Sequence, residues 1–461
     1  MKNKVLIQQS LLYDLESFLI KYNYNRKTGK LNLDYLVYYM SLFISLPSYY
    51  RNENQDYHIV SLSSKNLKKI YSGYVNCFDF LIKHEIIKIV SNHSSDNKTS
   101  RRFVLNDKYF CSKIVSYEIT NPKLIKGLNS THTDDRILNC LNRRPHLIKY
   151  FDGNLIIDTK RAYGIIEQYR ETNYKKYQSG LQIIKEFHYQ EWRCTNSYQT
   201  DDRLHSNLTR LNKELRETLN YFGEKLGAVD IKTSQPYFFS VILKAILKKD
   251  KQLLHEIGAT KVLSNENIDG LFSLNIDKSN VIEFVNIVLN GDFYINFQKS
   301  LEMKYDENGS PYRMVTNYKN KKNKVINFEN PFIKEIYKNE RSYSKSVVME
   351  TFFSRPNHNF EGTKAFKQSY PSVFEIMKYI KLHCVEFDRL LTNVEAHCLL
   401  DIVALNFSKK YPNVPIWSIH DSLVTTESNV ELLKKQIEEI LSDLTTIDTK
   451  KYQAIAIEEY W

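Results

Sequence analysis

Apolar residues near the start of the chain recur at the spacing of an α-helix. The pattern covers residues 6–22 and 31–46, and a Gly-Lys step at Gly29 interrupts it. The most apolar run in this region, residues 35–46, is too short and too polar to span a bilayer. It therefore predicts a buried helix, and we expect no membrane partner.

The pattern then changes to short elements in a recognisable order. The sequence predicts, in turn, a strand over 57–62, helices over 64–71 and 75–84, and strands over 86–90 and 101–105 joined by a polar hairpin tip at 94–100. Helix, helix and then a basic hairpin is the order of winged-helix modules, and residues 1–115 resemble one. In such modules the second helix enters the major groove of DNA and the hairpin contacts its backbone.

This resemblance implies that the N-terminal unit binds nucleic acid through its basic residues Lys65, Lys68, Arg101 and Arg102. The alternative is a winged-helix-like scaffold that contacts only protein. Residues 116–202 are predicted to be a mostly helical connector, with 156–190 carrying the interleaved charges of a solvated helix face. This connector is the candidate for a reduced thumb domain.

Composition limits the class of protein. The 461 residues predict two or three domains, and 42% hydrophobic residues with only 13 Gly and 10 Pro exclude a low-complexity chain. The net charge of +12 suits a polyanionic partner such as nucleic acid. The 6 cysteines form no CxxC pair and no zinc spacing, and no signal peptide stands at the start, so we expect a reducing, cytoplasmic location.

Two apolar strands are each predicted to end on an aspartate. Residues 226–229 run into Asp230, and residues 416–419 run into His420 and Asp421. Two strands that each deliver a carboxylate to one sheet edge can hold a pair of divalent cations. Carboxylate oxygens suit Mg²⁺, which typically takes one or two carboxylates and completes its shell with substrate phosphates.

A third segment supplies cations and an aromatic residue. Arg341 and Lys345 are four residues apart and share one face of a predicted helix, and Phe353 follows on that face about two turns later. Such a helix can hold a triphosphate and stack on its base. Each of these signals is common in proteins when it stands alone, so the weight rests on their order and spacing.

In that order, residues 203–461 resemble the palm and fingers of the family A DNA polymerases and of the related phage-type single-subunit RNA polymerases. The resemblance rests on four segments and on the C-terminal ending, which are residues 203–216 with 223–230, residues 230–240, residues 341–353, residues 415–426 and residues 455–461. It predicts an α+β fold in which a winged-helix-like domain precedes a compact right-hand polymerase domain.

The resemblance implies a role for each matching residue. Asp230 and Asp421, with Ile231 beside them, take the metal positions, and Lys345 also serves as a catalytic residue that protonates the leaving pyrophosphate. The nucleotide-binding positions are Arg341, Lys345, Phe353 with Phe352 as the near alternative, Tyr237 and Gln235; the nucleic-acid-binding positions are Arg203, His205 and His420. A preceding helix over 391–401 either faces the primer–template through Glu395 or His397 or, as we favour, packs in the core.

Several departures leave the sugar preference open. The spacer between Asp230 and Ser234 is longer than in DNA polymerases and fits the RNA polymerase form, and Asp421 is followed by Ser422 as in phage RNA polymerases. Tyr237 stands nearest to the glutamate that excludes ribonucleotides in DNA polymerases. The end of the third segment, Met-Glu-Thr-Phe-Phe-Ser at residues 349–354, also lacks the Phe-Gly pair that is usual there in the family.

The sequence therefore predicts a template-directed nucleotidyltransferase, first of all a small family A-like DNA polymerase without an exonuclease. Its expected cofactor is Mg²⁺, with Mn²⁺ as a substitute, and its expected partners are a DNA primer–template and nucleoside triphosphates. An RNA polymerase or primase, with RNA as template or product, is the alternative. A non-catalytic DNA-binding replication initiator, in a phage or mobile element, is the second alternative.

Overall fold

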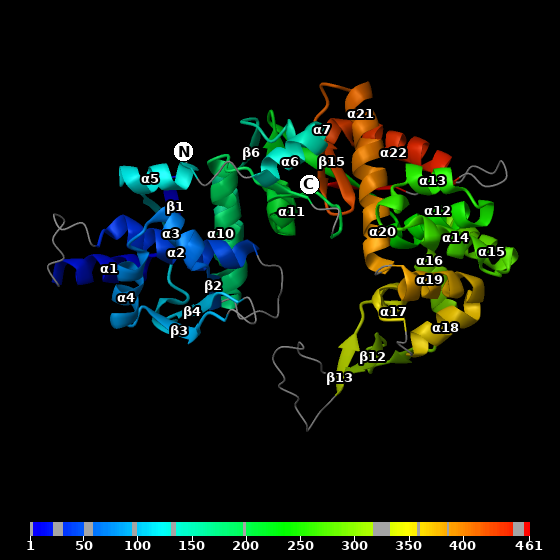
Figure 1. The fold of residues 1–461 in the computed structure, drawn as a ribbon, viewed down its shortest axis with the longest axis horizontal. Helices are drawn as coiled ribbons and strands as arrows, with labels where there is room; N and C mark the ends of the chain where they lie inside the picture. The colour runs from blue at the N-terminus through cyan, green and yellow to red at the C-terminus, as the bar shows by residue number, and fades with distance from the viewer. Residues whose placement is uncertain are drawn as a thin grey trace.

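The computed structural model describes residues 3–21, 31–49, 59–94, 99–130, 135–196, 200–316, 332–356, 360–384, 387–445 and 456–461. The fold is mixed α+β, with helices and several antiparallel sheets. Figure 1 shows an N-terminal module in blue and cyan, a central sheet, and a helical lobe in green and yellow from which a small sheet projects. The expected α+β class is confirmed.

The N-terminal module begins with a strand where the sequence predicts a helix. β1 (Lys4–Gln8) pairs antiparallel with β5 (Ile114–Glu118), and α1 (Gln9–Lys21) starts only after it. The apolar spacing of residues 6–8 fits either state, and pairing with a distant strand decides between them. The predicted boundary at residue 115 falls inside β5.

The rest of the module follows the predicted order. Its elements are α2 (Leu33–Tyr49), β2 (Ile59–Leu62), α3 (Ser64–Ile70), α4 (Tyr74–Lys83), β3 (Ile87–Ser91), β4 (Arg101–Leu105), η2 (Asp107–Tyr109) and α5 (Pro122–Ser130). The strands form an antiparallel sheet of order β2-β4-β3, and Ser94 bridges Thr99 near the hairpin tip. Residues 95–98 of the predicted tip lie outside the described residues. The core of this module extends to Leu128.

The connector links this module to the central sheet. It contains α6 (Asp135–Arg143), α7 (Pro145–Ile148), β6 (Leu155–Ile157), α8 (Thr159–Glu167), α9 (Tyr169–Thr172), α10 (Tyr174–His188) and β7 (Cys194–Thr195), and it is followed by β8 (His205–Ser206) and α11 (Asn207–Arg210). The long helix α10 packs on α2 and on α8, and it stands between the N-terminal module and the sheet in Figure 1. β6 is part of the central sheet, so the connector contributes a strand to that sheet as well as helices.

The central sheet holds the two predicted aspartate strands. After η3 (Lys213–Thr218) come β9 (Leu219–Tyr221), β10 (Glu224–Ile231), β14 (Trp417–Ile419), β15 (Ser422–Thr426) and β16 (Ala456–Tyr460). The strand order is β14-β15-β10-β9-β6, and β16 also pairs with β10. All of these pairings are antiparallel. β10 therefore has partners on both edges along its length, with its apolar centre buried.

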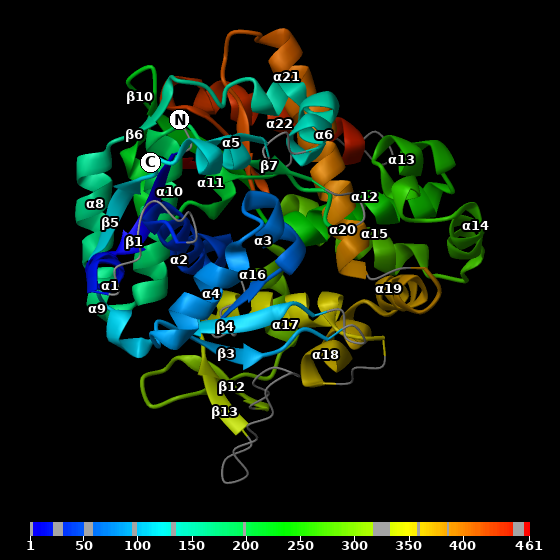
Figure 2. The same ribbon diagram turned by 60° about the vertical axis from the view of Figure 1, so that its left-hand side comes forward.

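Helices from the middle of the chain form the lobe beside this sheet, as Figure 2 shows from a second direction. They are α12 (Ser234–Lys248), α13 (Lys251–Glu256), η4 (Ala259–Lys261), α14 (Asn265–Ser273), α15 (Lys278–Asn290), α16 (Phe293–Phe297), η5 (Gln298–Ser300), α17 (Glu340–Phe353), α18 (Glu361–Ser369) and α19 (Pro371–His383). A small antiparallel sheet of β11 (Lys304–Tyr305), β12 (Pro311–Thr316) and β13 (Phe332–Ile336) directly precedes α17.

One continuous helical stretch runs through the core. It joins α20 (Phe387–Ala396), the π-helical η6 (His397–Val403) and α21 (Ala404–Lys410), and leads through β14 and β15 to η7 (Glu427–Asn429) and α22 (Val430–Thr445). Residues Phe387–Lys410 are long and apolar enough to cross a membrane, but 67% of their most apolar window is buried inside the fold. Such burial is typical of a core helix.

Candidate functional site

Asp230 and Asp421 come together on neighbouring strands. In the β10–β15 ladder Asp230 lies opposite Ser422, the residue after Asp421. The chain turns between β14 and β15 at His420, whose φ of 55° is in the left-handed region, so Asp421 is delivered to the sheet edge beside Asp230. Both aspartates are half-buried.

The two carboxylates repel each other. Burial and the negative charge of Asp421 raise the pKa of Asp230 to about 7, while the positive charge of Lys345 acts in the opposite direction. A pair of close carboxylates with this electrostatic cost is stabilised by a cation between them. The arrangement also shows that Lys345, on the helix α17, is near enough to Asp230 to influence its charge.

The carboxylates of Asp230 and Asp421 are hard oxygen donors, which suit Mg²⁺ better than a soft metal. Ile231 has a buried side chain, and its backbone N–H donates to Oδ1 of Asp230 at 2.9 Å. Only its backbone carbonyl could serve as a ligand. Within the described ranges no group of three or more His, Cys, Asp or Glu side chains is placed to hold a metal ion.

A fully buried glutamate lies next to this pair. Glu395 on α20 is 1% exposed and accepts hydrogen bonds from Ser234 Oγ and Gln235 Nε2, both at 2.6 Å. Its other oxygen accepts from Nε of Arg203 at 3.0 Å and from Nη2 of the same guanidinium. The structure therefore brings Arg203 and Gln235 to the site but directs both side chains to Glu395.

The helix α17 carries the predicted cations. Arg341 donates from Nε to Oδ2 of Asp292 at 2.7 Å, and its guanidinium lies 5.3 Å from the centre of the Tyr294 ring. Lys232, two residues after Asp230, approaches the same carboxylate oxygen at 3.5 Å. Lys345 is exposed one turn further along the helix. Asp292 thus contacts both Lys232, which follows β10, and Arg341, at the start of α17.

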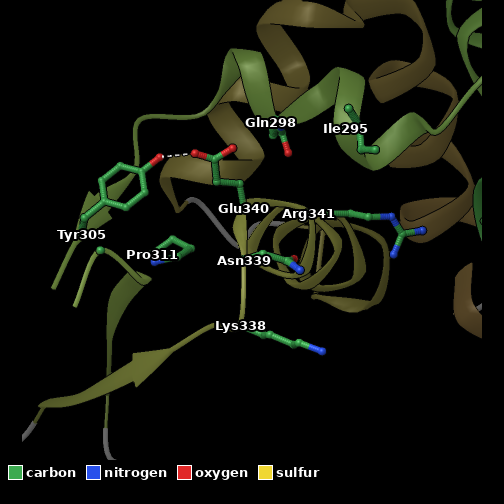
Figure 3. A pocket seen from close by; sticks show the side chains of 9 residues that line it. Ile295, Gln298, Tyr305, Pro311, Lys338, Asn339, Glu340 and Arg341 are labelled. Atoms are coloured by element: carbon green, nitrogen blue, oxygen red, sulfur yellow. Dashed lines mark hydrogen bonds between the residues drawn. The ribbon is translucent and has the colours of Figure 1, made fainter.

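A shallow pocket adjoins the start of α17. Figure 3 shows Lys338 and Arg341 extending toward the same side, while Glu340 turns back to accept a hydrogen bond from the Tyr305 hydroxyl at 2.7 Å. The helix N-cap is Asn339, whose side chain accepts from the backbone N–H of Ser342. Two cations near a capped helix N-terminus suit an anionic group.

The two aromatic candidates on α17 have different surroundings. Phe353 is 46% exposed and available to a ligand, whereas Phe352 is fully buried against Phe239, Phe366 and Phe387. Phe352 is therefore a core residue, which corrects its assignment as an alternative stacking residue. Adjacent helical residues face different directions, and only one of the two can face the site.

Tyr237 does not line the site. Its ring is 2% exposed, and its hydroxyl donates to the backbone carbonyl of Leu441 at 2.9 Å, on α22. This corrects the assignment of Tyr237 to the sugar position. The first turn of α12 turns Ser234 and Gln235 toward Glu395, which leaves Tyr237 on the face that packs into the core.

The predicted nucleic-acid residues fall into two groups, one near the aspartate site and one on the N-terminal module. His205 is a half-exposed residue beside the sheet, and its Nε2 is 3.0 Å from Oδ2 of Asp201. His420 sits in the β14–β15 turn next to Asp421. The four basic residues of the N-terminal module are exposed, with Lys65 and Lys68 on α3 and Arg101 and Arg102 on β4.

The basic residues of α3 continue onto a neighbouring helix. α5 packs against α3 and adds the exposed residues Lys123 and Lys126, and neither helix contains an acidic residue. By contrast α4, the second helix of the winged-helix order, exposes Val75, Asn76 and Asp79. The positive charge of this module is therefore concentrated on α3, α5 and the hairpin.

Sequence reasoning missed two parts of the site. It did not select Asp292, whose signal is a Gly-Asp step before the apolar helix α16. It set Glu395 aside as a packing residue, although a lone acid inside the apolar stretch of residues 390–400 was a signal for a buried ion pair.

Comparisons with known proteins find a likeness among solved structures and none at the level of sequence. No protein-family model and no curated protein match the sequence. Among solved structures the chain is similar to the POL domain of Pol1 from M. smegmatis in complex with DNA primer-template and dNTP, with a TM-score of 0.33 and 10% sequence identity. The match covers 66% of this chain and 55% of that one, so the chain spans about half the length of the structure it resembles.

Proposed function

We propose that this protein is a template-directed nucleotidyltransferase, first of all a small DNA polymerase. The observation that carries the proposal is that Asp230, on β10, and Asp421, directly before β15, lie beside each other, with Lys345 of α17 close enough to offset their charge. Two carboxylates facing cations across a site is the arrangement that phosphoryl transfer needs.

The roles of the chain's own residues follow from their positions. Asp230 and Asp421, with the backbone carbonyl of Ile231, would hold Mg²⁺ or Mn²⁺. When bound there, such cations would lower the pKa of an attacking 3′-hydroxyl and neutralise charge on the transferred phosphate. Arg341 and Lys345 would bind the triphosphate. The 3′-hydroxyl would lose its proton to water and its oxygen would bond to the α-phosphorus, while the bond from that phosphorus to the bridging oxygen breaks and Lys345 gives a proton to the leaving pyrophosphate.

Phe353 supports binding of the base, because its exposed ring lies two turns beyond Lys345 on the same helix. Arg341 would exchange its contact with Asp292 for the triphosphate. Positive charge on α3, α5 and the hairpin supports a nucleic-acid partner for the N-terminal module. The preferred partner is a DNA primer–template.

The RNA polymerase or primase alternative is kept because of one observation. Tyr237 is buried in the core, so it does not fill the space of a 2′-hydroxyl. Without a bulky residue from this position, exclusion of ribonucleotides would need another group.

Primer extension separates these functions. The full chain is given dNTPs and rNTPs in separate reactions, on primed and on unprimed templates, with Mg²⁺ or Mn²⁺, and Asp421→Asn is the matched inactive variant. Extension of the primer with dNTPs supports the DNA polymerase, and products from rNTPs support the alternative. If wild type and Asp421→Asn are equally inactive on every template, the enzyme proposal fails and a non-catalytic DNA-binding initiator replaces it.

A further inference from the structure

Glu395 is an unusual residue for its surroundings. It lies on α20 among the fully buried apolar side chains of Leu390, Leu391 and Val394, and is itself 1% exposed. A buried carboxylate is strongly unfavourable unless charged and polar partners satisfy it. Its partners therefore determine why a glutamate is tolerated there.

Those partners come from two segments that border the aspartate pair. One oxygen of Glu395 accepts from Arg203, which precedes β8, and the other accepts from Ser234 and Gln235 in the first turn of α12. The short loop from Asp230 leads directly into that turn. Glu395 thus connects the start of α12, which follows Asp230, to Arg203, which lies near Asp421.

Arg203 has a second acidic neighbour. Besides Glu395, Asp421 acts electrostatically on its guanidinium, and the arginine side chain is 22% exposed. If Glu395 lost its charge, the guanidinium would remain partly buried and would gain most by pairing with another carboxylate that already acts on it. Asp421 acts on it more strongly than Asp201 does, and Asp201 already contacts His205.

We propose that Glu395 is a positioning residue that holds Arg203 away from Asp421 and fixes the start of α12, so that Asp230 and Asp421 stay available to a divalent cation. This inference rests on the proposed function for its biological meaning. In physical terms, Arg203 and a metal ion compete for the carboxylate of Asp421. Glu395 itself does not touch the metal or the nucleotide.

The chain provides a matched control. Glu186 on α10 is also fully buried and accepts hydrogen bonds from an arginine, Arg210, and from the side-chain amides of Gln182 and Asn207. Replacing it with glutamine removes a similar buried charge from a different part of the fold. General destabilisation should then be similar in the two variants.

The test measures binding of Mn²⁺ alone to the full chain by electron paramagnetic resonance, without nucleotide or DNA. Glu395→Gln should weaken Mn²⁺ binding by about tenfold to a hundredfold, the range seen when groups that orient metal ligands are removed. Glu186→Gln should change it by less than about twofold. Unchanged binding in Glu395→Gln, or an equal loss in both variants, would overturn the proposal.

A double variant tests the competition and guards against misfolding. Arg203→Ala combined with Glu395→Gln leaves no unpaired buried charge, so it should fold and bind Mn²⁺ to within about threefold of wild type. Weak binding in the double variant would overturn the role given to Arg203. Wild type that binds Mn²⁺ in this pattern but incorporates no nucleotide would contradict the proposed function and leave the inference intact.

Discussion

Asp292 accepts a hydrogen bond from Nε of Arg341 at 2.7 Å and also caps the helix α16 through the backbone N–H groups of Tyr294 and Ile295. Although burial acts to raise the pKa of Asp292, the hydrogen bond from Arg341 holds that pKa below its usual range. The Asp292 carboxylate therefore already binds Arg341, the residue that we propose binds the triphosphate. Asp292 and a triphosphate compete for the same guanidinium.

Asp292→Asn should therefore lower the KM for nucleotide. The ion pair is partly exposed, with Arg341 39% exposed, so it is worth about 0.2–1 kcal/mol, which corresponds to a decrease in KM of up to about fivefold. Steady-state primer extension measures it. Asp277→Asn is the control, because Asp277 caps α15 without contacting Arg341. A KM that stays the same or rises contradicts the competition.

Replacing either aspartate of the site should abolish incorporation without harming the fold. Asp230→Asn or Asp421→Asn removes a metal ligand and relieves the repulsion that raises the pKa of Asp230. We expect less than a few per cent of wild-type primer extension, with an equal or higher melting temperature and unchanged DNA affinity. Activity above that level in either variant would show that the two-metal assignment is wrong.

Tyr237→Phe should affect stability and leave sugar selection unchanged. The substitution removes the hydrogen bond to the backbone carbonyl of Leu441, and a hydrogen bond of this kind contributes about 0.5–1.5 kcal/mol to stability. Urea unfolding measures this loss. The ratio of ribonucleotide to deoxyribonucleotide incorporation should stay within about twofold of wild type, because the ring lies in the core. A large change in that ratio would mean that Tyr237 does take part in sugar selection.

The N-terminal module should supply salt-sensitive binding of duplex DNA. Each phosphate contact contributes about 0.9 to the slope of log K against log salt concentration, so alanine at all four basic positions should flatten the slope by up to about 3.6. These positions are Lys65, Lys68, Arg101 and Arg102. The control replaces four exposed lysines of the helical lobe and α21, which are Lys248, Lys249, Lys278 and Lys409.

If the salt slope is unchanged in the variant of the four module residues, or changes equally in the control variant, the N-terminal module contacts protein and not DNA. Deleting residues 1–115 is a poorer test, because β5 and α10 pack with elements inside that range. The point variants leave those contacts in place. They also separate α3 and the hairpin from α4, which exposes Asp79 and carries little positive charge.

The aspartate strands could be predicted because their signals are local. Residues 226–229 and 416–419 are short apolar runs, each followed by an aspartate, and the structure pairs them through β10 and β15. The direction in which the side chain of Tyr237 points could not be predicted in the same way. Every residue of α12 from Ser234 to Ile246 is buried, so no side of this part of the helix faces solvent and the usual contrast of buried and exposed positions does not reveal its orientation.

Partners far apart in sequence were also beyond prediction. Arg203 and Glu395 are 192 residues apart in sequence and meet only when α20 packs against α12 in the folded chain, and no local pattern couples them. The same reason explains β1, whose last residues, 6–8, fit the spacing of a helix but pair with β5. A local pattern identifies the residue types of a site, and tertiary packing decides which of them meet.

The side-chain amine of Lys381 should make the stability of the fold depend on pH. Its Nζ donates to the carbonyls of Thr351 and Ser354 at 2.6 and 2.9 Å, which ties α19 to the C-terminal end of α17. Burial lowers the pKa of Lys381 to about 8 from an ordinary value of 10.5, with the charge of Asp388 acting in the opposite direction. The unfolded chain therefore binds more protons than the folded chain between these two pH values.

Because of this difference, the contribution of Lys381 to stability should rise with pH from about 8 to about 10.5 and stay constant below about 8. Urea unfolding of wild type and Lys381→Met at several pH values measures it. Lys381→Met should be less stable at pH 7 by about 1–3 kcal/mol, since two carbonyls lose their donor, and the gap should widen above pH 8. Lys364→Met, at an exposed position of α18, should show no such widening. A gap that is constant from pH 7 to 10 would mean that Lys381 keeps its ordinary pKa in the fold.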